Sequence, residues 1–328
     1  MKMYVGIDVA KDTLAVAWPQ TAMSWQVRSI PNAPDAIRKL IKELPDQAHV
    51  VLEATGSYSV LLTYLLCQAQ VVVSVINPKQ SHHFAQLQLA VTKTDESDAV
   101  LLARYGQLVQ PPRYTMENDV LLRLKQKRTL LRHYKKQQRS LANLQHAFSP
   151  LPVQDAQVGS SLQQVLSHFQ TAIVEVTAEI EQLTKQHFPD QLRRLTSIQG
   201  ISTTIATALI EITSGFAQFH SAKALAKYIG VVPVIYQSGK SQITKGICKT
   251  GDPHLRSMLY MASWSAIRYN KPCQQLYQRL KAAGKAPKVA LIAVVNKLLR
   301  QAFAVVKFDQ DFDPNYQPIL RPSPCFLT

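Results

Sequence analysis

The stretch Tyr4-Val5-Gly6-Ile7-Asp8-Val9-Ala10 places a carboxylate inside a short apolar run that is typical of a buried β-strand. Burying an ionised carboxylate is costly unless it is paired with a cation or binds a metal ion. Glu53 ends a second apolar run, and Asp95 and Asp98 lie three residues apart at the start of a helix-like segment, where they share one face. These four carboxylates predict a site for two divalent cations, the kind of site that performs phosphodiester chemistry.

Other interpretations of these acids remain open. The four could be unrelated surface acids, and Asp95 could simply cap its helix. Asp12 and Glu96 compete as ligands, although Asp12 is expected at a hairpin turn and Glu96 is expected to point away from the face of Asp95. We favour the metal site because Asp8 lies inside a strand-like run, where a lone charge is unfavourable.

The predicted elements around the carboxylates have a recognisable order. We expect strands over 5–9, 14–18, 25–30, 49–52 and 71–76, and helices over 35–44, 58–70, 79–89 and 95–105. The order β-β-β-α-β-α-β-α is that of the α/β ribonuclease-H-like (RuvC-like) fold. In that fold the first strand, the fourth strand and the last helix converge on one metal site, and the four carboxylates fall on these elements.

Charge divides the chain into a neutral part and a basic part. Residues 1–110 contain nine Lys/Arg and nine Asp/Glu, so the formal net charge of +16 belongs to residues 111–328. This asymmetry suits a catalytic domain followed by modules that hold a polyanion. The four cysteines are scattered and contain no C-x-x-C pair, so neither a zinc site nor a disulfide framework is indicated. With no signal peptide and no apolar run of about 18 residues, we expect an intracellular protein and no membrane contact.

Two long helical patterns follow the neutral part, over 118–146 and 160–187, and together they predict an antiparallel hairpin or a dimerising coiled coil. The first carries eight cations with no acid between Val120 and His146. A solvated face is the alternative, but this one-sided charge favours contact with nucleic acid. The predicted binding residues in this helix are Arg123, Lys127, Arg128, Arg132, Lys135, Lys136 and Arg139.

Ser238 stands before a glycine at the end of a strand-like run, with Lys240, Lys245 and Lys249 after it. A serine there could attack a phosphate, and the lysines would stabilise the developing charge. Most Ser-Gly pairs are ordinary turns, and Ser241 could serve equally well.

The chain resembles the DEDD transposases of the insertion-sequence one-ten family, whose relatives include the pilin-gene invertases. The resemblance covers nearly the whole length and rests on the order and spacing of several motifs. The motifs that carry it are Gly6-Ile7-Asp8-Val9-Ala10-Lys11, Glu53-Ala54-Thr55-Gly56-Ser57-Tyr58, Val75-Ile76-Asn77-Pro78, Lys93-Thr94-Asp95-Glu96-Ser97-Asp98-Ala99, Ile198 to Ile201, Tyr228-Ile229-Gly230-Val231-Val232-Pro233, Gln237-Ser238-Gly239-Lys240-Ser241 and Lys249-Thr250-Gly251. Departures are mild: Ser202 and Val231 replace a common glycine and a common leucine.

The resemblance implies that Asp8, Glu53, Asp95 and Asp98 bind Mg²⁺ and that Ser238 attacks DNA to form a covalent phosphoserine link. It also implies a Holliday-junction-like intermediate and, as in several members, a structured non-coding guide RNA that pairs with donor and target DNA. The active site would combine the acidic domain of one subunit with the serine of another, in a homo-oligomer acting at the nucleoid in the cytoplasm of a bacterium.

The domain organisation expected from these features has four segments. They are a catalytic domain at 1–110, a basic linker with coiled-coil helices at 111–190, a mainly α-helical transposase domain with the serine at 191–308, and an extended tail at 309–328. The expected function is that of an insertion-sequence transposase or site-specific DNA recombinase. The alternatives are a metal-only endonuclease of the junction-resolvase type and a non-catalytic nucleic-acid-binding protein.

Overall fold

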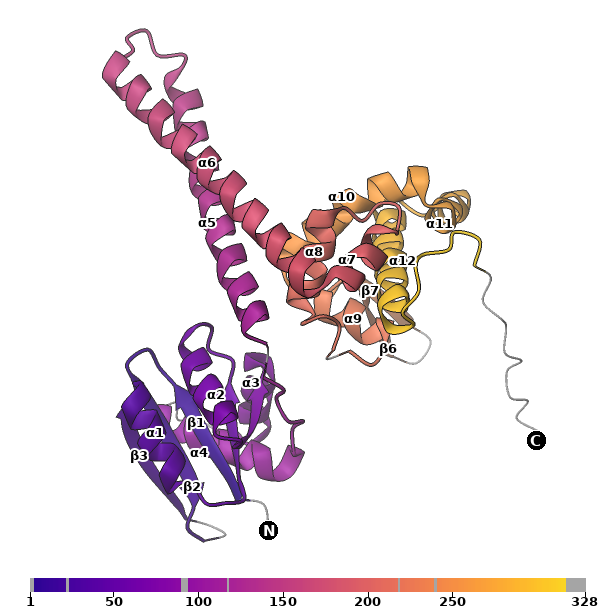
Figure 1. The fold of residues 1–328 in the computed structure, drawn as a ribbon. Helices are drawn as coiled ribbons and strands as arrows, with labels where there is room; N and C mark the ends of the chain where they lie inside the picture. Colours follow the sequence, from indigo (N-terminus) through magenta and orange to yellow (C-terminus); the bar gives the residue numbers. More distant parts are fainter. Residues whose placement is uncertain are drawn as a thin grey trace, which may run out of the picture. The chain divides into compact units, whose positions relative to one another are not determined.

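The computed structural model describes residues 3–21, 24–89, 94–116, 118–217, 219–238 and 241–316, with only the backbone at 238 and 241–245. The chain divides into two compact units, Met1–Met116 and Glu117–Thr328, and each is described here by itself (Figure 1).

The first unit is built on a five-stranded mixed sheet with the strand order β3-β2-β1-β4-β5. Strands β1 and β2, and β2 and β3, pair antiparallel, whereas β4 is parallel to β1 and to β5. The strands are β1 (Met3–Val9), β2 (Thr13–Pro19), β3 (Trp25–Pro31), β4 (Ala48–Glu53) and β5 (Val72–Ile76), and the helices are α1 (Pro34–Glu43), α2 (Tyr58–Gln68), α3 (Pro78–Leu87) and α4 (Asp95–Val109). The order of elements predicted from the sequence is the order observed.

Alternation along β1 decides which helices cover which face of this sheet. Val5, Ile7 and Val9 are buried in a cluster with side chains of α1 and α2. Tyr4 points to the opposite face and packs in a second cluster with side chains of α3 and α4, including Phe84. Because successive strand residues face opposite sides, Asp8 belongs to the α4 face.

The first unit continues beyond residue 110, where a linker is expected. The hydroxyl of Ser74 on β5 donates to the carbonyl oxygens of Pro111 and Pro112 at 3.1 and 2.7 Å, and the Tyr114 amide donates to Val73 at 2.7 Å. The proline segment is therefore held along β5, and the unit ends at Met116.

The second unit is mainly helical. Its helices are α5 (Asp119–Phe148), α6 (Ala156–His187), α7 (Pro189–Thr196), α8 (Thr203–Ile212), α9 (Ala222–Ile229), α10 (Pro253–Tyr269), α11 (Lys271–Ala282) and α12 (Pro287–Lys307), and its two strands are β6 (Pro233–Ser238) and β7 (Ser241–Ile247). Helices α5 and α6 form a long antiparallel hairpin within the chain (Figure 1). Hydrogen bonds from Gln138 to Gln170 and from Gln145 to Gln163 set its register.

Helix α12 lies at the centre of the second unit. Val294, Val295, Leu298 and Leu299 are all fully buried and pack with side chains of α8, α9 and α10. This helix is also long and apolar enough, by composition, to cross a membrane, and it is the one such helix among the described residues. Its buried side chains are those of a core helix.

The start of the expected extended tail is attached to α7. Arg194 pairs with Asp309 at 2.7 Å, Arg193 pairs with Asp311, and the Phe312 amide donates to the hydroxyl of Ser197 at 2.9 Å. Residues 317–328 of the predicted tail lie outside the described residues.

Candidate active site

The position of Asp8 depends on a close approach between β1 and α4. A Cβ atom added at Gly6 would lie 2.0 Å from the carbonyl oxygen of Ala99 and 2.5 Å from the amide nitrogen of Ala103, so only glycine fits here. Asp8 is two residues further along the same face of β1. It therefore points toward the turn of α4 that precedes Ala99, which is the turn that carries Asp95 and Asp98.

Glu53 reaches the same place from the neighbouring strand. In the parallel pairing of β1 with β4, Ile7 stands opposite Leu52, so the next position along brings Asp8 beside Glu53. Glu53 is half-buried, and its carboxylate accepts a hydrogen bond of 2.5 Å from the hydroxyl of Ser81. Ser81 was not singled out from the sequence. Its position three residues after Pro78, in the first turn of a helix that follows β5, is the signal that could have found it.

The N-terminus of α4 is capped by Thr94 and not by Asp95. The Thr94 hydroxyl accepts from the Ser97 amide at 3.1 Å, and the Ser97 hydroxyl accepts from the Thr94 amide at 2.9 Å, which together form a capping box. Asp95 and Asp98 are thereby left for another role. The partial positive charge of the helix N-terminus favours acids in this first turn.

Electrostatics show that the four carboxylates are neighbours. Burial, followed by the charges of Asp98, Asp95 and Glu53, raises the pKa of Asp8 from 3.8 to about 6, against a lowering contribution from the Val9 backbone. The two acids expected to compete as ligands, Asp12 and Glu96, lie outside this group: both are exposed, and neither is among the causes of the raised pKa of Asp8. The structure thus brings all four predicted residues into one field of negative charge.

This donor set fits hard divalent cations. Within the described part of the chain, no three His, Cys, Asp or Glu side chains are close enough to hold one ion. The pKa of Asp8 is nevertheless raised, first by burial and then by the negative charges of Asp98, Asp95 and Glu53. Carboxylates without a counter-charge repel one another, and bound cations would remove that repulsion. Oxygen ligands on Asp8, Glu53, Asp95 and Asp98 are those that Mg²⁺ and similar ions prefer.

Ser238 lies at the end of β6, opposite Ser241 in the pairing with β7. The side chains of Ser238, Ser241 and Lys245 and the whole of Lys240 lie outside the described residues. Lys249, just beyond β7, is exposed. The strand pair places the predicted nucleophile at the tip of a hairpin in the second unit.

Two glycines fix the base of this hairpin. Gly230, with φ of +84°, ends α9, and a Cβ there would lie 2.8 Å from the Thr250 amide nitrogen. A Cβ at Gly251 would lie 2.1 Å from the Tyr228 carbonyl oxygen. Arg256 donates to the carbonyl oxygens of Ile229 and Gly251 at 3.1 and 2.6 Å. These contacts explain the glycines in the motifs Tyr228–Pro233 and Lys249–Gly251 as positions of backbone contact.

The predicted cations of α5 do not share one environment. Arg128 is 5% exposed and pairs with Glu211 of α8, so it is not available to a nucleic acid. Burial and the nearby Arg132 lower the pKa of Arg128 to about 10, which leaves it cationic at neutral pH. Arg132 in turn pairs with Asp252, which caps α10 through the His254 and Leu255 amides at 2.7 and 3.0 Å.

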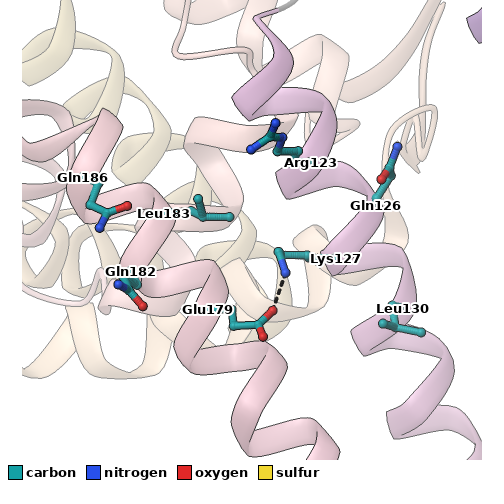
Figure 2. A pocket seen from close by; sticks show the side chains of 8 residues that line it. All are labelled: Arg123, Gln126, Lys127, Leu130, Glu179, Gln182, Leu183 and Gln186. Carbon is teal, nitrogen blue, oxygen red and sulfur yellow. Dashed lines mark hydrogen bonds and ion pairs between the residues drawn. The ribbon is translucent and has the colours of Figure 1, made fainter.

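Lys127 also has a partner within the chain. Figure 2 shows its side chain turned across the hairpin toward Glu179 of α6, with which it forms an ion pair. Arg123 lies one turn earlier and lines the same pocket between the helices. The exposed cations of the predicted set that have no ion-pair partner among the described residues are Arg123, Lys135, Lys136 and Arg139.

Comparison with known proteins places the chain in a family. The model for DEDD transposases of the IS110 type matches residues 5–145, and the model described as Transposase IS116/IS110/IS902 family matches residues 192–278. The first match includes the four carboxylates and most of α5, and the second includes the β6–β7 hairpin.

Two relatives cover nearly the whole chain. Pilin gene-inverting proteins of Moraxella lacunata and Moraxella bovis are each 30% identical to it, over 95% of this chain and 98% of the relative. The transposase for insertion sequence element IS1111A of Coxiella burnetii is 28% identical over 30% of this chain and 27% of its own length. With both family models in order along one chain and relatives aligned end to end, this protein belongs to the IS110 family of transposases and is a DNA transposase or recombinase.

Proposed function

We propose that this recombinase cuts and rejoins DNA with two separate chemical centres, one in each unit. The first is a ribonuclease-H-like site in which Asp8, Glu53, Asp95 and Asp98 hold Mg²⁺. The second is Ser238, which acts as the nucleophile. The observation that carries the proposal is the gathering of four carboxylates around one point: burial, followed by the charges of Asp98, Asp95 and Glu53, raises the pKa of Asp8.

In the acidic site, bound Mg²⁺ would supply Lewis-acid stabilisation of charge on the scissile phosphate. The chain's own contribution is to position the ligands: Gly6 allows β1 to touch α4, and Ser81 orients Glu53 by a hydrogen bond. Both contacts restrict movement of the carboxylates, which supports the role of this site as a rigid metal cradle.

At the serine, the proposed step conserves phosphodiester energy. A bond forms between Oγ of Ser238 and phosphorus, one phosphorus–oxygen bond to deoxyribose breaks, and the serine proton ends on the released sugar hydroxyl. Attack by a sugar hydroxyl of another strand reverses the step and regenerates the serine, so rejoining needs no ATP. Lys240, Lys245 and Lys249 would stabilise the charge of the phosphorane.

Two partners belong to the same proposal. A second copy of the chain would bring its serine to the acidic site of the first, because each unit alone carries half of the chemistry. A structured non-coding RNA would guide the choice of donor and target DNA, and the exposed α5 cations are suited to contact it. The protein would act at the nucleoid.

The serine is tested by trapping the covalent link under denaturing conditions. Ser238→Ala is expected to bind DNA and form no protein–DNA adduct, whereas the matched control Ser241→Ala keeps adduct formation. An adduct that persists in Ser238→Ala and disappears in Ser241→Ala would assign the nucleophile to Ser241. Cleavage without any adduct in the unmodified protein would favour the metal-only endonuclease.

The acidic site and the composite arrangement are tested together. Asp8→Ala and Ser238→Ala are each expected to be inactive when purified alone. Mixing the two inactive proteins restores adduct formation if one copy supplies the carboxylates and the other the serine. Failure of the mixture, under conditions where subunits exchange, would mean that both centres act within one chain. Sequencing the RNA that copurifies with the protein tests the guide.

A further inference from the structure

A groove in the second unit carries cations that no motif singled out as a group. The groove lies between α11, α12 and the base of the β6–β7 hairpin, all of which belong to the second unit (Figure 1). Its volume is about 1490 Å³. No Asp or Glu is among the described residues that line it. The cations that line it are Lys249, Lys271, Arg279, Lys288, Lys297 and Arg300.

Helix periodicity explains why the groove collects these cations. The buried face of α12 includes Leu291, Val294 and Leu298. Lys297 and Arg300 are three residues apart, so their side chains lie together outside this buried face. On α11 the one fully buried side chain is Cys273, so Arg279 is turned outward. Two helices thus present their polar faces to the same groove.

The charges in the groove have no acidic partners among the residues that the structure describes. None of the six cations is in an ion pair with a residue that the structure describes. Their hydrogen bonds are to neutral groups: Arg300 donates to the Asn296 amide oxygen at 3.1 Å, and Lys271 donates to that of Asn315 at 3.4 Å. Like charges around one concave surface raise its positive potential, which attracts a polyanion.

Apolar side chains line the groove beside the cations. They include Val231, Ile247, Leu276 and Ile292, and Tyr316, which is 68% exposed, also lines the groove. A DNA strand presents phosphates at regular intervals with apolar sugar surface between them. Its chemistry therefore matches a groove lined by both cations and apolar side chains.

We infer that this groove binds the phosphate backbone of the DNA substrate on the stretch that leads to the β6–β7 hairpin. The inference deepens the proposed function, on which it rests for the direction of the strand toward Ser238. From Ile247 at the base of the hairpin to Ser241 at its tip, the six residue-to-residue steps of the strand span about 20 Å. That length corresponds to about six base-pair steps of a duplex at 3.4 Å each.

The test compares two double variants that remove the same charge. The double variant Arg279→Gln with Arg300→Gln removes two positive charges from the groove. The control, Lys185→Gln with Arg268→Gln, removes two exposed cations elsewhere in the same unit. The probe is a fluorescent duplex of about 30 base pairs, and its Kd is measured by anisotropy between about 0.05 and 0.3 M NaCl. The slope of log Kd against log salt then counts phosphate contacts.

The groove variant is expected to lose about 1.8 from this slope and to bind about 60-fold more weakly at 0.1 M salt, because each duplex phosphate contact contributes about 0.9. The control variant is expected to keep the slope of the unmodified protein. An equal loss in both variants, or none in the groove variant, overturns the inference. Loss of RNA binding with unchanged DNA binding assigns the groove to RNA and overturns it as well.

Binding is measured without cleavage, so the result is independent of the nucleophile. A groove variant with a reduced slope stands even if Ser238→Ala still forms an adduct, which would overturn the proposed serine chemistry alone. Conversely, the groove inference alone is overturned if adduct formation depends on Ser238 while the groove variant keeps the salt slope of the unmodified protein.

Discussion

Helix α5 and the groove beside α12 are both rich in Lys and Arg, but they differ in how many of these cations form ion pairs with acids of the chain. In α5, Lys127, Arg128 and Arg132 are each paired with an acid from another helix or its cap. In the groove, none of the six cations has an acidic partner among the described residues. A run of basic residues in the sequence therefore indicates charge, whereas the availability of that charge depends on acids that are distant in the chain.

The physical reason lies in the face that each residue occupies. Leu121, Leu124, Arg128 and Leu131 recur at three- and four-residue spacing, so Arg128 belongs to the buried face of α5. A buried guanidinium needs a counter-charge, and Glu211 of α8 provides it. The groove cations stand on faces turned to solvent, where no such pairing is required.

The largest expected effect comes from breaking the buried pair. Arg128→Ala should lower the free energy of unfolding by about 3–5 kcal/mol, because it leaves the carboxylate of Glu211 buried and unpaired. Urea denaturation of the full chain measures the loss. The double variant Arg128→Met with Glu211→Leu should recover most of it, and a double variant as unstable as the single one would contradict this account.

The next effect sharpens the distinction between the faces of α5. Lys135→Gln with Arg139→Gln removes two exposed cations one turn apart, and the salt slope for nucleic acid binding should fall by up to about 1.8. Thermal unfolding should be unchanged, since these charges have no ion-pair partner among the described residues. An unchanged slope for both DNA and RNA would show that this face of α5 is only solvated.

A third effect has the opposite sign, because burial and the neighbouring carboxylates disfavour the ionised form of Asp8. The pKa of Asp8 is about 6 when folded and 3.8 when unfolded. Folding therefore favours the protonated form, so the stability of the metal-free protein falls as pH rises from about 4 to about 6 and stays lower at neutral pH. With an allowance for solvent screening, Asp8→Asn should raise the unfolding free energy at pH 7.5 by about 1–2 kcal/mol in chelator.

The matched measurement adds Mg²⁺. It should raise the melting temperature of the unmodified protein more than that of Asp8→Asn, because the variant has lost a ligand. A variant that is less stable than the unmodified protein in chelator would mean that folding does not disfavour the ionised form of Asp8.

The smallest effect concerns the half-exposed pair on the hairpin. Lys127→Ala should change the free energy of unfolding by less than about 1 kcal/mol, because ion pairs near solvent contribute little. Its salt slope for nucleic acid should match that of the unmodified protein if Glu179 occupies the charge. A clear loss of slope would show that Lys127 exchanges its partner for a phosphate.

Much of the first unit could be predicted because its signals are local. Short apolar runs in β1 and β4 indicate buried strands, and the Thr94 to Asp98 stretch has the pattern of a capped helix start. The capping box itself is readable from Thr94 and Ser97, yet Asp95 remained a candidate cap until the hydrogen bonds assigned that role to Thr94.

Helix α11 is an example of what was missed. Its N-terminus depends on Asn270, whose side chain accepts from the Cys273 amide at 3.3 Å and is itself buried against Gln301 and the Gln199 carbonyl oxygen. Because these partners are 31 and 71 residues away, neither lies in the local window that predicts a helix. Without α11, one wall of the groove is absent from the sequence-based description.

The order of elements in the first unit, the four carboxylates and the surplus of positive charge could all be read from the amino-acid sequence, because periodicity, capping and composition are local properties. Tertiary structure decided which charges remain available. It buried Arg128 against Glu211, tied Arg132 to the cap of α10, and brought the cations of α11 and α12 to one groove. Pairing and burial depend on residues far apart in the chain, and only the folded molecule brings those residues together.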